Sequence, residues 1–257
     1  MLSSDHRLHV VVPARYGSQR LPGKPLIDLA GTPMIVRVYD KVRAALGEVD
    51  VVVAVDDDRI LQVLQSRSIP AAMTSPECES GTDRAAEVAR QRGWHSNDIV
   101  VNVQGDEPLL PADLLHTFTS NCMLQQEFTM STVSVPVQSL EEVFDPNVVK
   151  VVSRRDGFAV SFSRAPIPFD RDRDHASWVP SNYRRHVGIY AYSNSTLQLI
   201  TGTAPCELEM LERLEQLRAI WLGVPISVLD WHESPPGGVD TALDAQRVIA
   251  VLQGEAQ

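Results

Sequence analysis

The chain has 257 residues, 44% of them hydrophobic, and a formal net charge of −10 at pH 7. This length and apolar content can bury a substantial core, either as one elaborated domain or as a large domain with a smaller one. The acidic balance argues against broad binding of nucleic acid or of anionic membranes, because both require a positive surface.

The cysteines and the amino terminus indicate a cytoplasmic protein. Cys78, Cys122 and Cys206 are odd in number and lie far apart without C-x-x-C spacing. This pattern disfavours a disulfide framework and a zinc knuckle, and a reducing cytosol is the expected compartment. Residues 1–9 carry no apolar signal region, and no segment approaches the roughly 20 apolar residues that span a bilayer. We therefore expect no membrane and no nucleic-acid partner.

From residue 8 to about residue 137, strand-like apolar runs alternate with segments of helical periodicity. Such alternation is typical of a mostly parallel sheet with crossover helices. We therefore expect an α/β fold with a Rossmann-like sheet and helices on both faces. The predicted strands are 8–13, 49–55, 70–73 and 99–104, and the predicted helices are 33–46 with Thr32 as cap, 56–64, 82–92 and 111–126.

After about residue 130 the pattern changes to strands that follow one another closely. The predicted strands are 130–137, 148–153, 158–163 and 184–192, followed by a long helix 207–222, a strand 226–229 and a final helix 240–253. Short strands joined by turns are typical of antiparallel pairing. We expect a nucleotide-binding α/β domain of residues 1–137 and 193–257, with an inserted antiparallel lobe of residues 138–192.

The first predicted strand leads into a loop that carries three cations. Arg15, Arg20 and Lys24 lie within ten residues of one another, between an apolar run and a predicted helix. Open α/β sheets hold phosphates at this kind of place. The loop is not a P-loop, because Pro25 stands where that motif has its metal-binding Ser or Thr. It indicates a triphosphate site, and the alternative is a solvated basic loop.

Two carboxylates follow glycines at places where a metal could be held. Asp106 comes directly after the strand 99–104, at the end of a strand where ligands of open α/β sheets gather. It is a candidate Mg²⁺ ligand, or an Asp of an ordinary turn. Asp240 is a second candidate, or the cap of the last helix. Together with the basic loop they suit metal-assisted displacement at a phosphate.

Two further segments near predicted helix starts are ambiguous. Ser80, Gly81 and Arg84 belong to a helix start that could contact a nucleoside or phosphate, or could be an ordinary cap. The acidic run 56–58 also begins a helix. We favour capping for it over metal binding, because acidic residues stabilise the positive end of a helix.

The predicted lobe contributes polar residues that could bind an acid or a sugar. Arg164 and Arg171 suit bidentate capture of a carboxylate, or are solvated loop charges. His186 and Tyr190 share one face of a strand, which suits a sugar pocket or simply a wet face. Two polar residues near the centre of the predicted helix 207–222 could reach polyol hydroxyls: Glu215 and Gln216.

Longer motifs occur in a defined order along the whole chain. They are PARYGSQRLPGKPL (13–26), SGTDR (80–84), VNVQGDEPLLP (101–111), DPNVVKVV (145–152), FSRAPIPFDRD (162–172), RHVGIYAY (185–192), LEQLRAIW (214–221) and GVDT (238–241). Through these motifs the chain resembles, nearly end to end, the 3-deoxy-manno-octulosonate (Kdo) cytidylyltransferases. It departs from the family pattern at Cys78, where His is common, at Phe169, where Trp is common, and slightly in the run 235–238.

The resemblance implies the transfer CTP + Kdo → CMP-Kdo + pyrophosphate, a step of lipopolysaccharide core biosynthesis, on a nucleotide-diphospho-sugar transferase fold that dimerises through its lobe. It assigns the CTP phosphates to Arg15, Arg20 and Lys24, the nucleoside to Ser80, Gly81, Arg84 and Gln104, and Mg²⁺ to Asp106 and Asp240, with Ala14 also in the nucleotide site. It assigns the Kdo pocket to Arg164, Arg171, His186, Tyr190, Glu215 and Gln216. The residues expected to carry catalysis are Arg15, Lys24, Asp106 and Asp240.

The expected mechanism is in-line attack by the anomeric hydroxyl of Kdo on the α-phosphorus, with positioning and charge neutralisation as the main sources of rate and no protein base. Two alternatives stay open. The acceptor could be a sialic acid or an amino-substituted octulosonate such as 8-amino-Kdo, since local hydrogen bonding decides such differences. The chain could also be a non-catalytic nucleotide-binding regulator, which would not need two metal carboxylates.

Overall fold

The computed structural model describes residues 6–17 and 21–254, and the chain divides into two compact units. The first unit is residues 1–126 with 235–257, and the second is residues 127–234. The second unit contains the predicted lobe 138–192 and extends beyond it on both sides. It does so because the strands on either side of the lobe pair with each other and with the lobe.

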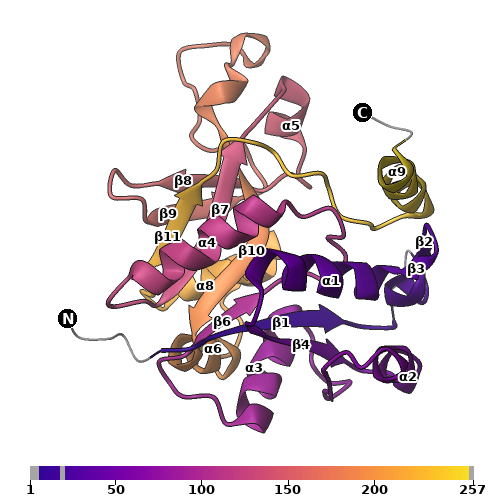
Figure 1. Cartoon of the computed structure of the whole chain (residues 1–257). Coiled ribbons are helices and arrows are strands. Elements are labelled where there is room, and N and C mark those ends of the chain that lie inside the picture. Colours follow the sequence, from indigo (N-terminus) through magenta and orange to yellow (C-terminus); the bar gives the residue numbers. More distant parts are fainter. Residues whose placement is uncertain (1–5, 18–20, 255–257) are drawn as a thin grey trace. The chain divides into compact units, whose positions relative to one another are not determined.

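The first unit is built on four parallel strands. Their order is β6-β1-β4-β5, formed by β1 (Leu8–Ala14), β4 (Asp50–Val55), β5 (Ala71–Met73) and β6 (Ile99–Asn102). β1 lies between β4 and β6 and pairs with both in parallel register (Figure 1). Valines 10–12 of β1 and 51–53 of β4 are almost fully buried, as a sheet covered on both faces requires.

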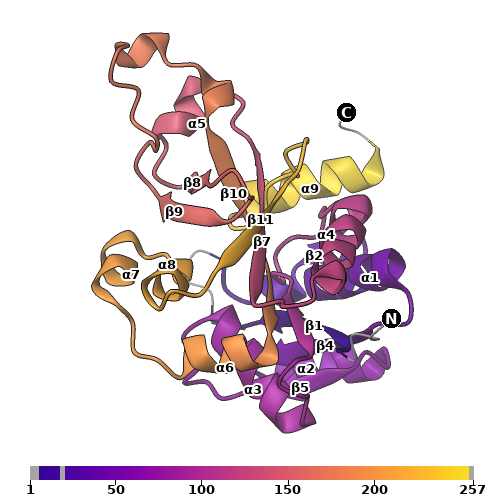
Figure 2. The same ribbon diagram turned by 90° about the vertical axis from the view of Figure 1, so that its left-hand side faces the viewer.

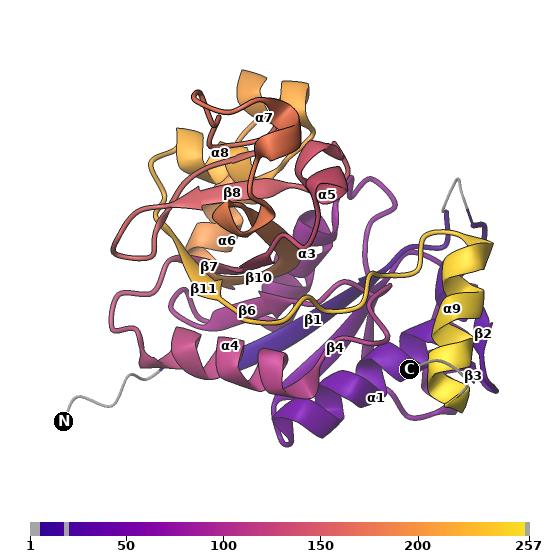
Figure 3. The ribbon, with the colours of Figure 1, turned by 90° about the horizontal axis from the view of Figure 1, so that it is seen from above.

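Helices cover both faces of this sheet. They are α1 (Met34–Leu46), α2 (Asp58–Ser66), α3 (Gly81–Arg92) and α4 (Ala112–Leu124), whereas α9 (Ala242–Gln253) packs on residues 28–29 and the start of α1. α1 and α4 pack together on one face, and α3 packs against β1, β4 and β6 on the other (Figures 2 and 3). In the part of the chain that the structure describes, no helix has the length and hydropathy needed to cross a membrane. The predicted α/β class with helices on both faces is confirmed.

The start of α1 differs from the prediction of a helix capped by Thr32. Thr32–Pro33 forms a short strand, β3, that pairs antiparallel with β2 (Asp28–Leu29). The helix therefore begins at Met34, with Pro33 in the N-cap position. The small hairpin decides the matter, because the backbone of Thr32 is used for pairing with Leu29.

The second unit is a mixed sheet with short helices. β7 (Met130–Pro136) pairs antiparallel with β10 (Arg184–Ser193), and in parallel with β11 (Ile226–Asp230). β8 (Lys150–Ser153) pairs antiparallel with β10 and with β9 (Ala159–Ser163). Four short helical segments were not predicted: α5 (Leu140–Phe144), α6 (Asn194–Thr201) and the 3₁₀ turns His175–Ser177 and Pro180–Asn182.

The predicted single helix 207–222 is wrong. The structure has two short helices, α7 (Glu207–Glu212) and α8 (Gln216–Trp221), because Arg213 adopts a left-handed conformation with φ 53°. A buried ion pair joins the two helices. Arg218 donates from Nε to Glu209 Oε2 at 2.7 Å and from Nη2 to Oε1 at 2.5 Å. The same guanidinium donates to the carbonyls of Ile200 and Thr203, and so ties α6 to this pair.

We expect Glu209→Ala to lower the free energy of unfolding by about 3–5 kcal/mol, because it leaves the buried Arg218 charge without its carboxylate. Denaturant unfolding followed by circular dichroism measures this change. Glu207→Ala removes an exposed carboxylate from the same helix and is the matched control, with an expected cost below about 1 kcal/mol. Equal costs for the two variants would contradict the role given to the pair.

Candidate functional site

The first unit contains a cavity of about 560 Å³ at the carboxyl ends of β1 and β6. It is lined by Pro13, Ala14, Arg15, Gly17, Lys24, Pro25, Met34, Glu79, Ser80, Gly81, Arg84, Gln104, Gly105, Asp106 and Asp240. The nucleotide and metal candidates that fall on described residues therefore meet in one place. Arg20, the remaining candidate of this group, lies outside the described residues.

The basic loop that follows β1 makes a tight turn before Lys24. Gly23 has φ 69° and precedes a single 3₁₀ turn, Lys24–Leu26. Its N–H donates to the carbonyl of Tyr16 at 3.3 Å. A Cβ at Gly23 would also lie 3.2 Å from Tyr16 Oη, so glycine suits this position both by its conformation and by its size. The turn directs Lys24 into the cavity, where Arg15 also lies.

Lys24 joins the two candidate metal ligands. Its Nζ donates to Asp106 Oδ2 at 2.6 Å and to Asp240 Oδ1 at 3.2 Å. The Lys24 side chain is 15% exposed, and the Asp106 and Asp240 side chains are 30% and 48% exposed. Two carboxylates that share one cation must lie close together, and the positive charge offsets their mutual repulsion. The site is thus a carboxylate pair with a cation already between its members.

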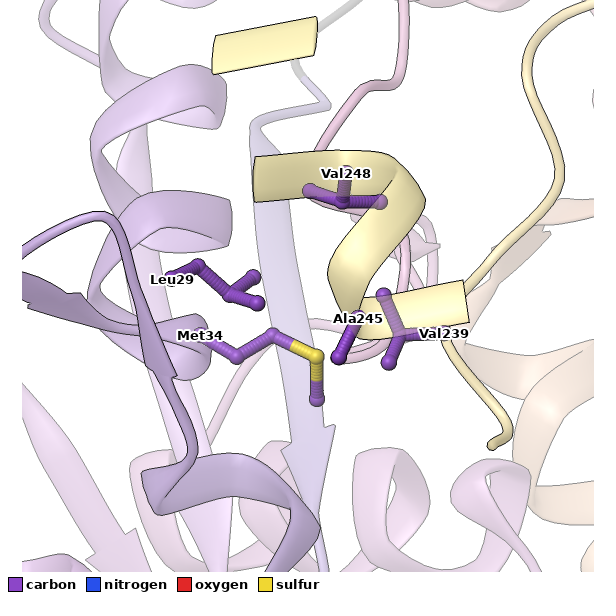
Figure 4. Close-up of a cluster of buried hydrophobic side chains, with 5 residues drawn as sticks. All are labelled: Leu29, Met34, Val239, Ala245 and Val248. Atoms are coloured by element: carbon purple, nitrogen blue, oxygen red, sulfur yellow. The ribbon is translucent and has the colours of Figure 1, made fainter. Parts of the chain in front are cut away.

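A hydrophobic cluster explains how Asp240 reaches Asp106. Val239 is fully buried with Leu29, Met34, Ala245 and Val248, so α9 packs on the beginning of α1 (Figure 4). The N–H of Val239 also donates to the carbonyl of Asp106 at 2.8 Å. These contacts fix the residue that follows Val239 beside the loop that follows β6.

The structure excludes the alternative that Asp240 caps the last helix. The N-cap of α9 is Thr241, whose side chain accepts from the N–H of Asp244 in a reciprocal capping box. The carboxylate of Asp240 instead bonds to Lys24.

Gly105 allows the loop of Asp106 to approach β1. A Cβ at this position would lie 2.4 Å from the carbonyl oxygen of Pro13, a distance that no side chain tolerates. Gln104, Gly105 and Asp106 therefore follow the end of β6 closely along the end of β1. Gly105 is part of the sequence motif 101–111, but only this packing shows why the position excludes a side chain.

The segment 80–84 is both a helix cap and a wall of the cavity. Ser80 caps α3 in a reciprocal capping box with Asp83. Arg84 is 3% exposed, and its guanidinium donates to Asp56 Oδ2 at 2.9 Å and to Thr74 Oγ1 at 2.8 Å. The capping alternative therefore holds for Ser80, while a contact of this segment with a nucleoside or phosphate stays a prediction.

Asp56 connects Arg84 to the basic loop. Its Oδ1 accepts from the N–H of Tyr16 at 2.9 Å. Asp57 caps α2 and also binds Arg59, whose guanidinium lies 3.5 Å from the centre of the Tyr16 ring. The acidic run 56–58 therefore contributes a loop anchor and a helix cap, and the favoured capping interpretation is confirmed for Asp57.

In the second unit, His186 and Tyr190 lie on one face of β10 with ring centres 5.2 Å apart. His186 Nε2 shares a hydrogen bond of 2.9 Å with Thr132 Oγ1. Burial and the charges of Tyr192 and Glu215 raise the pKa of Tyr190 well above its usual value. Within the described residues, the Tyr190 hydroxyl and Gln216 Nε2 are buried and have no hydrogen-bond partner. Buried polar groups are normally paired, so these two suit a polar ligand.

The two arginines predicted to capture a carboxylate have different surroundings. Arg164 donates three hydrogen bonds to backbone carbonyls, of Pro146, Glu212 and Arg213. Arg171 lies exposed in the long connection between β9 and β10. The structure thus commits much of the Arg164 guanidinium to the protein's own backbone.

The chain is similar in sequence to known cytidylyltransferases. The family model described as cytidylyltransferase matches residues 9–226. A curated 3-deoxy-manno-octulosonate cytidylyltransferase 2 of Paraburkholderia phytofirmans is 59% identical over 97% of this chain and 95% of its own length. A 3-deoxy-manno-octulosonate cytidylyltransferase of Aeromonas hydrophila is 47% identical over 95% of this chain and 98% of its own length.

A solved structure of a CMP:2-keto-3-deoxy-manno-octonic acid synthetase in complex with CTP superimposes with a TM-score of 0.88. It is 37% identical in sequence, and the match covers 97% of this chain and 100% of that chain.

We expect His186 to stay neutral throughout the physiological pH range, because burial first and then the charge of Arg185 lower its pKa from 6.5 to about 3. The unfolded chain takes up a proton near pH 6.5 and the folded chain does not, so this residue costs stability as the pH falls from about 6.5 towards 3. NMR of the ring protons, assigned with His186→Gln, measures the pKa. A titration midpoint of His186 above pH 5 would contradict the low pKa. An acid-induced loss of stability of equal size in the wild-type protein and in His186→Gln would contradict it too.

Proposed function

The chain belongs to the family of the 3-deoxy-manno-octulosonate cytidylyltransferases, and we propose that its cavity transfers the cytidylyl group of CTP to Kdo. The products are CMP-Kdo and pyrophosphate. The observation that carries the proposal is the Lys24 ammonium between Asp106 and Asp240, at the end of a basic loop. A nucleotide-binding regulator would not need this carboxylate pair.

We place the triphosphate against the basic loop. Arg15 and Lys24 line the cavity from one side, and Arg20 belongs to the same loop in sequence. Ala14, Gln104, Ser80 and Gly81 line the same cavity and are our candidates for contacts to the nucleoside. For Arg84 we propose an indirect role, since its guanidinium holds Asp56 and through it the beginning of the loop.

We propose Asp106 and Asp240 as the ligands of Mg²⁺. Their oxygen atoms are the donors that this ion prefers, and Mg²⁺ is usually held by one or two carboxylates together with substrate phosphates. In residues 6–17 and 21–254, no three His, Cys, Asp or Glu side chains form a metal-binding group, so the remaining ligands would come from CTP and water. When bound, the ion would neutralise charge on the α-phosphate and favour the ionised form of the attacking hydroxyl.

The protein's own residues supply position and charge. The oxygen of the anomeric hydroxyl forms a bond to the α-phosphorus while the bond from that phosphorus to the pyrophosphate oxygen breaks, and the hydroxyl proton passes to solvent water. Arg15 and Lys24 bind the phosphates and offset the charge that moves onto the leaving pyrophosphate. Lys24 also holds both carboxylates, so their spacing is set before any substrate arrives. Holding both reactants in line is the main contribution, and we assign no protein base.

For Kdo we propose His186, Tyr190, Glu215 and Gln216 in the second unit. The buried Tyr190 hydroxyl and Gln216 amide support this. Neither has a hydrogen-bond partner among the described residues, and the hydroxyls of a polyol would provide one for each. His186 is neutral and can both donate and accept a hydrogen bond. Arg171 is our candidate for the sugar carboxylate, and the carbonyl contacts of Arg164 favour a different role for that residue.

We further propose that the enzyme works in the cytoplasm as a homodimer and serves lipopolysaccharide core biosynthesis. Cys78, Cys122 and Cys206, all within the described residues, form no disulfide bond, which agrees with a reducing compartment. The family resemblance supports the dimer and the pathway.

We expect Asp106→Asn to reduce pyrophosphate release from CTP and Kdo by roughly 10²–10³-fold, because the variant loses a charged ligand for Mg²⁺ and a partner of Lys24. Chelation of Mg²⁺ should abolish turnover of the wild-type enzyme, and added Mg²⁺ should restore it. Asp113→Asn, the same change at an exposed position on α4, should leave the rate unaltered. An unaltered rate in Asp106→Asn would remove Asp106 from the mechanism.

Pyrophosphate release with different acids tests the acceptor. With CTP and Mg²⁺ present, we expect rapid release with Kdo and release at least about tenfold slower with 8-amino-Kdo or a sialic acid, since pocket hydrogen bonds discriminate between such groups. Faster release with either of those acids would change the assigned acceptor. No release with any of the three would favour the regulator.

A further inference from the structure

The second unit contains a fully buried cation that the proposed reaction does not use. Lys150, at the start of β8, is 0% exposed. Its Nζ donates to three backbone carbonyls, of Asp145 at 2.9 Å, Val148 at 2.6 Å and Arg164 at 2.7 Å. An ammonium has three N–H donors, so all of them are used, as a buried charge requires. Lys150 therefore clamps the turn before β8 to the residue that follows β9.

Arg164 extends this clamp to the end of α7. Its backbone carbonyl accepts from Lys150, while its Nε donates to the carbonyl of Glu212 at 2.6 Å and its Nη2 to the carbonyl of Arg213 at 3.3 Å. The carboxylate of Glu212 accepts two hydrogen bonds from the end of β9 and the next residue. Its Oε1 accepts from Ser163 Oγ at 2.6 Å, and its Oε2 accepts from the N–H of Arg164 at 2.9 Å. Charge-assisted bonds of this kind are stronger than neutral ones.

These bonds meet where the helix predicted from the sequence is interrupted. The spacing of Leu208, Leu211 and Leu214 favours one continuous helix, whereas Arg213 takes a left-handed conformation that disfavours any residue with a Cβ. Such a conformation persists only where surrounding contacts hold it. The carbonyls of Glu212 and Arg213, which a continuous helix would use internally, are instead bound by Arg164.

The interruption decides where two proposed sugar contacts lie. Glu215 is the N-cap of α8 and Gln216 is its first residue, with Nε2 buried and unpartnered within the described residues. In an uninterrupted helix both side chains would point in other directions, because each residue turns by about 100° around the axis. The place of Glu215 and Gln216 therefore depends on the α7–α8 break.

We propose that Lys150, through Arg164 and Glu212, is a positioning residue for the acceptor sugar, because this network holds the break that presents Glu215 and Gln216. The inference rests on the proposed function, in which those two residues contact Kdo. Lys150 itself is buried below the surface and touches no substrate in this scheme.

The test is the kinetics of Lys150→Met, which keeps the length of the side chain and removes its three donors. We expect KM for Kdo to rise about tenfold while KM for CTP changes less than about twofold, since a small displacement of a positioning group is costly. Lys41→Met, on α1 of the first unit, is the matched control and should change neither KM. A variant that melts at lower temperature but keeps the wild-type KM for Kdo would overturn the inference.

Glu212→Gln covers the case in which Lys150→Met does not fold. It keeps the shape of the side chain and weakens the bonds to Ser163 and Arg164, so a rise of several-fold in KM for Kdo at constant KM for CTP is expected. An unchanged KM for Kdo in this variant would count against the network.

Gln216→Leu separates the two proposals. If this variant keeps the wild-type KM for Kdo, the proposed sugar site is wrong. If it raises that KM while Lys150→Met and Glu212→Gln do not, the sugar site stands and the positioning role of Lys150 is wrong.

Discussion

The bond from the Val239 N–H to the carbonyl of Asp106 is the contact on which the site depends. It brings together the loop that follows β6 and the segment that precedes α9. The ammonium of Lys24 can then donate to the carboxylates of both Asp106 and Asp240. If α9 did not pack on Leu29 and Met34, Asp106 would keep its position at the end of β6, but it would have no second carboxylate beside it.

Each unit uses buried or half-buried cations of its own to hold irregular backbone near candidate site residues. In the first unit, Arg84 holds Asp56 and thereby the start of the basic loop. In the second, Lys150 and Arg164 hold carbonyls around the α7–α8 break. Loops cannot satisfy their polar groups by regular pairing, so side-chain donors must do so wherever a loop is buried. The same donors fix the loop in one conformation, which a binding site requires.

Sequence reasoning succeeded where the signal was local. The valines of β1 and β4 marked buried strands, the acidic run at 56–58 marked a helix start, and two cations of the basic loop, Arg15 and Lys24, line the cavity. The anion site predicted at that loop stays a prediction. Sequence reasoning failed where a distant residue decided the outcome. The spacing of the leucines in 207–222 fits one helix. No residue within that segment indicates that Arg164 binds the carbonyls of Glu212 and Arg213, in the middle of the segment. Pairing with Leu29 likewise moved the start of α1 past Thr32.

By itself, the sequence determined the α/β class, the family and the residues that carry charge at the site, because periodicity and motif order are properties of short segments. The tertiary structure alone decided what those residues touch. It assigned the cap of α9 to Thr241 and the carboxylate of Asp240 to Lys24, and it turned Arg164 towards backbone carbonyls. These outcomes depend on contacts between residues far apart in the chain, and a local pattern contains no information about which distant partner reaches a given side chain first.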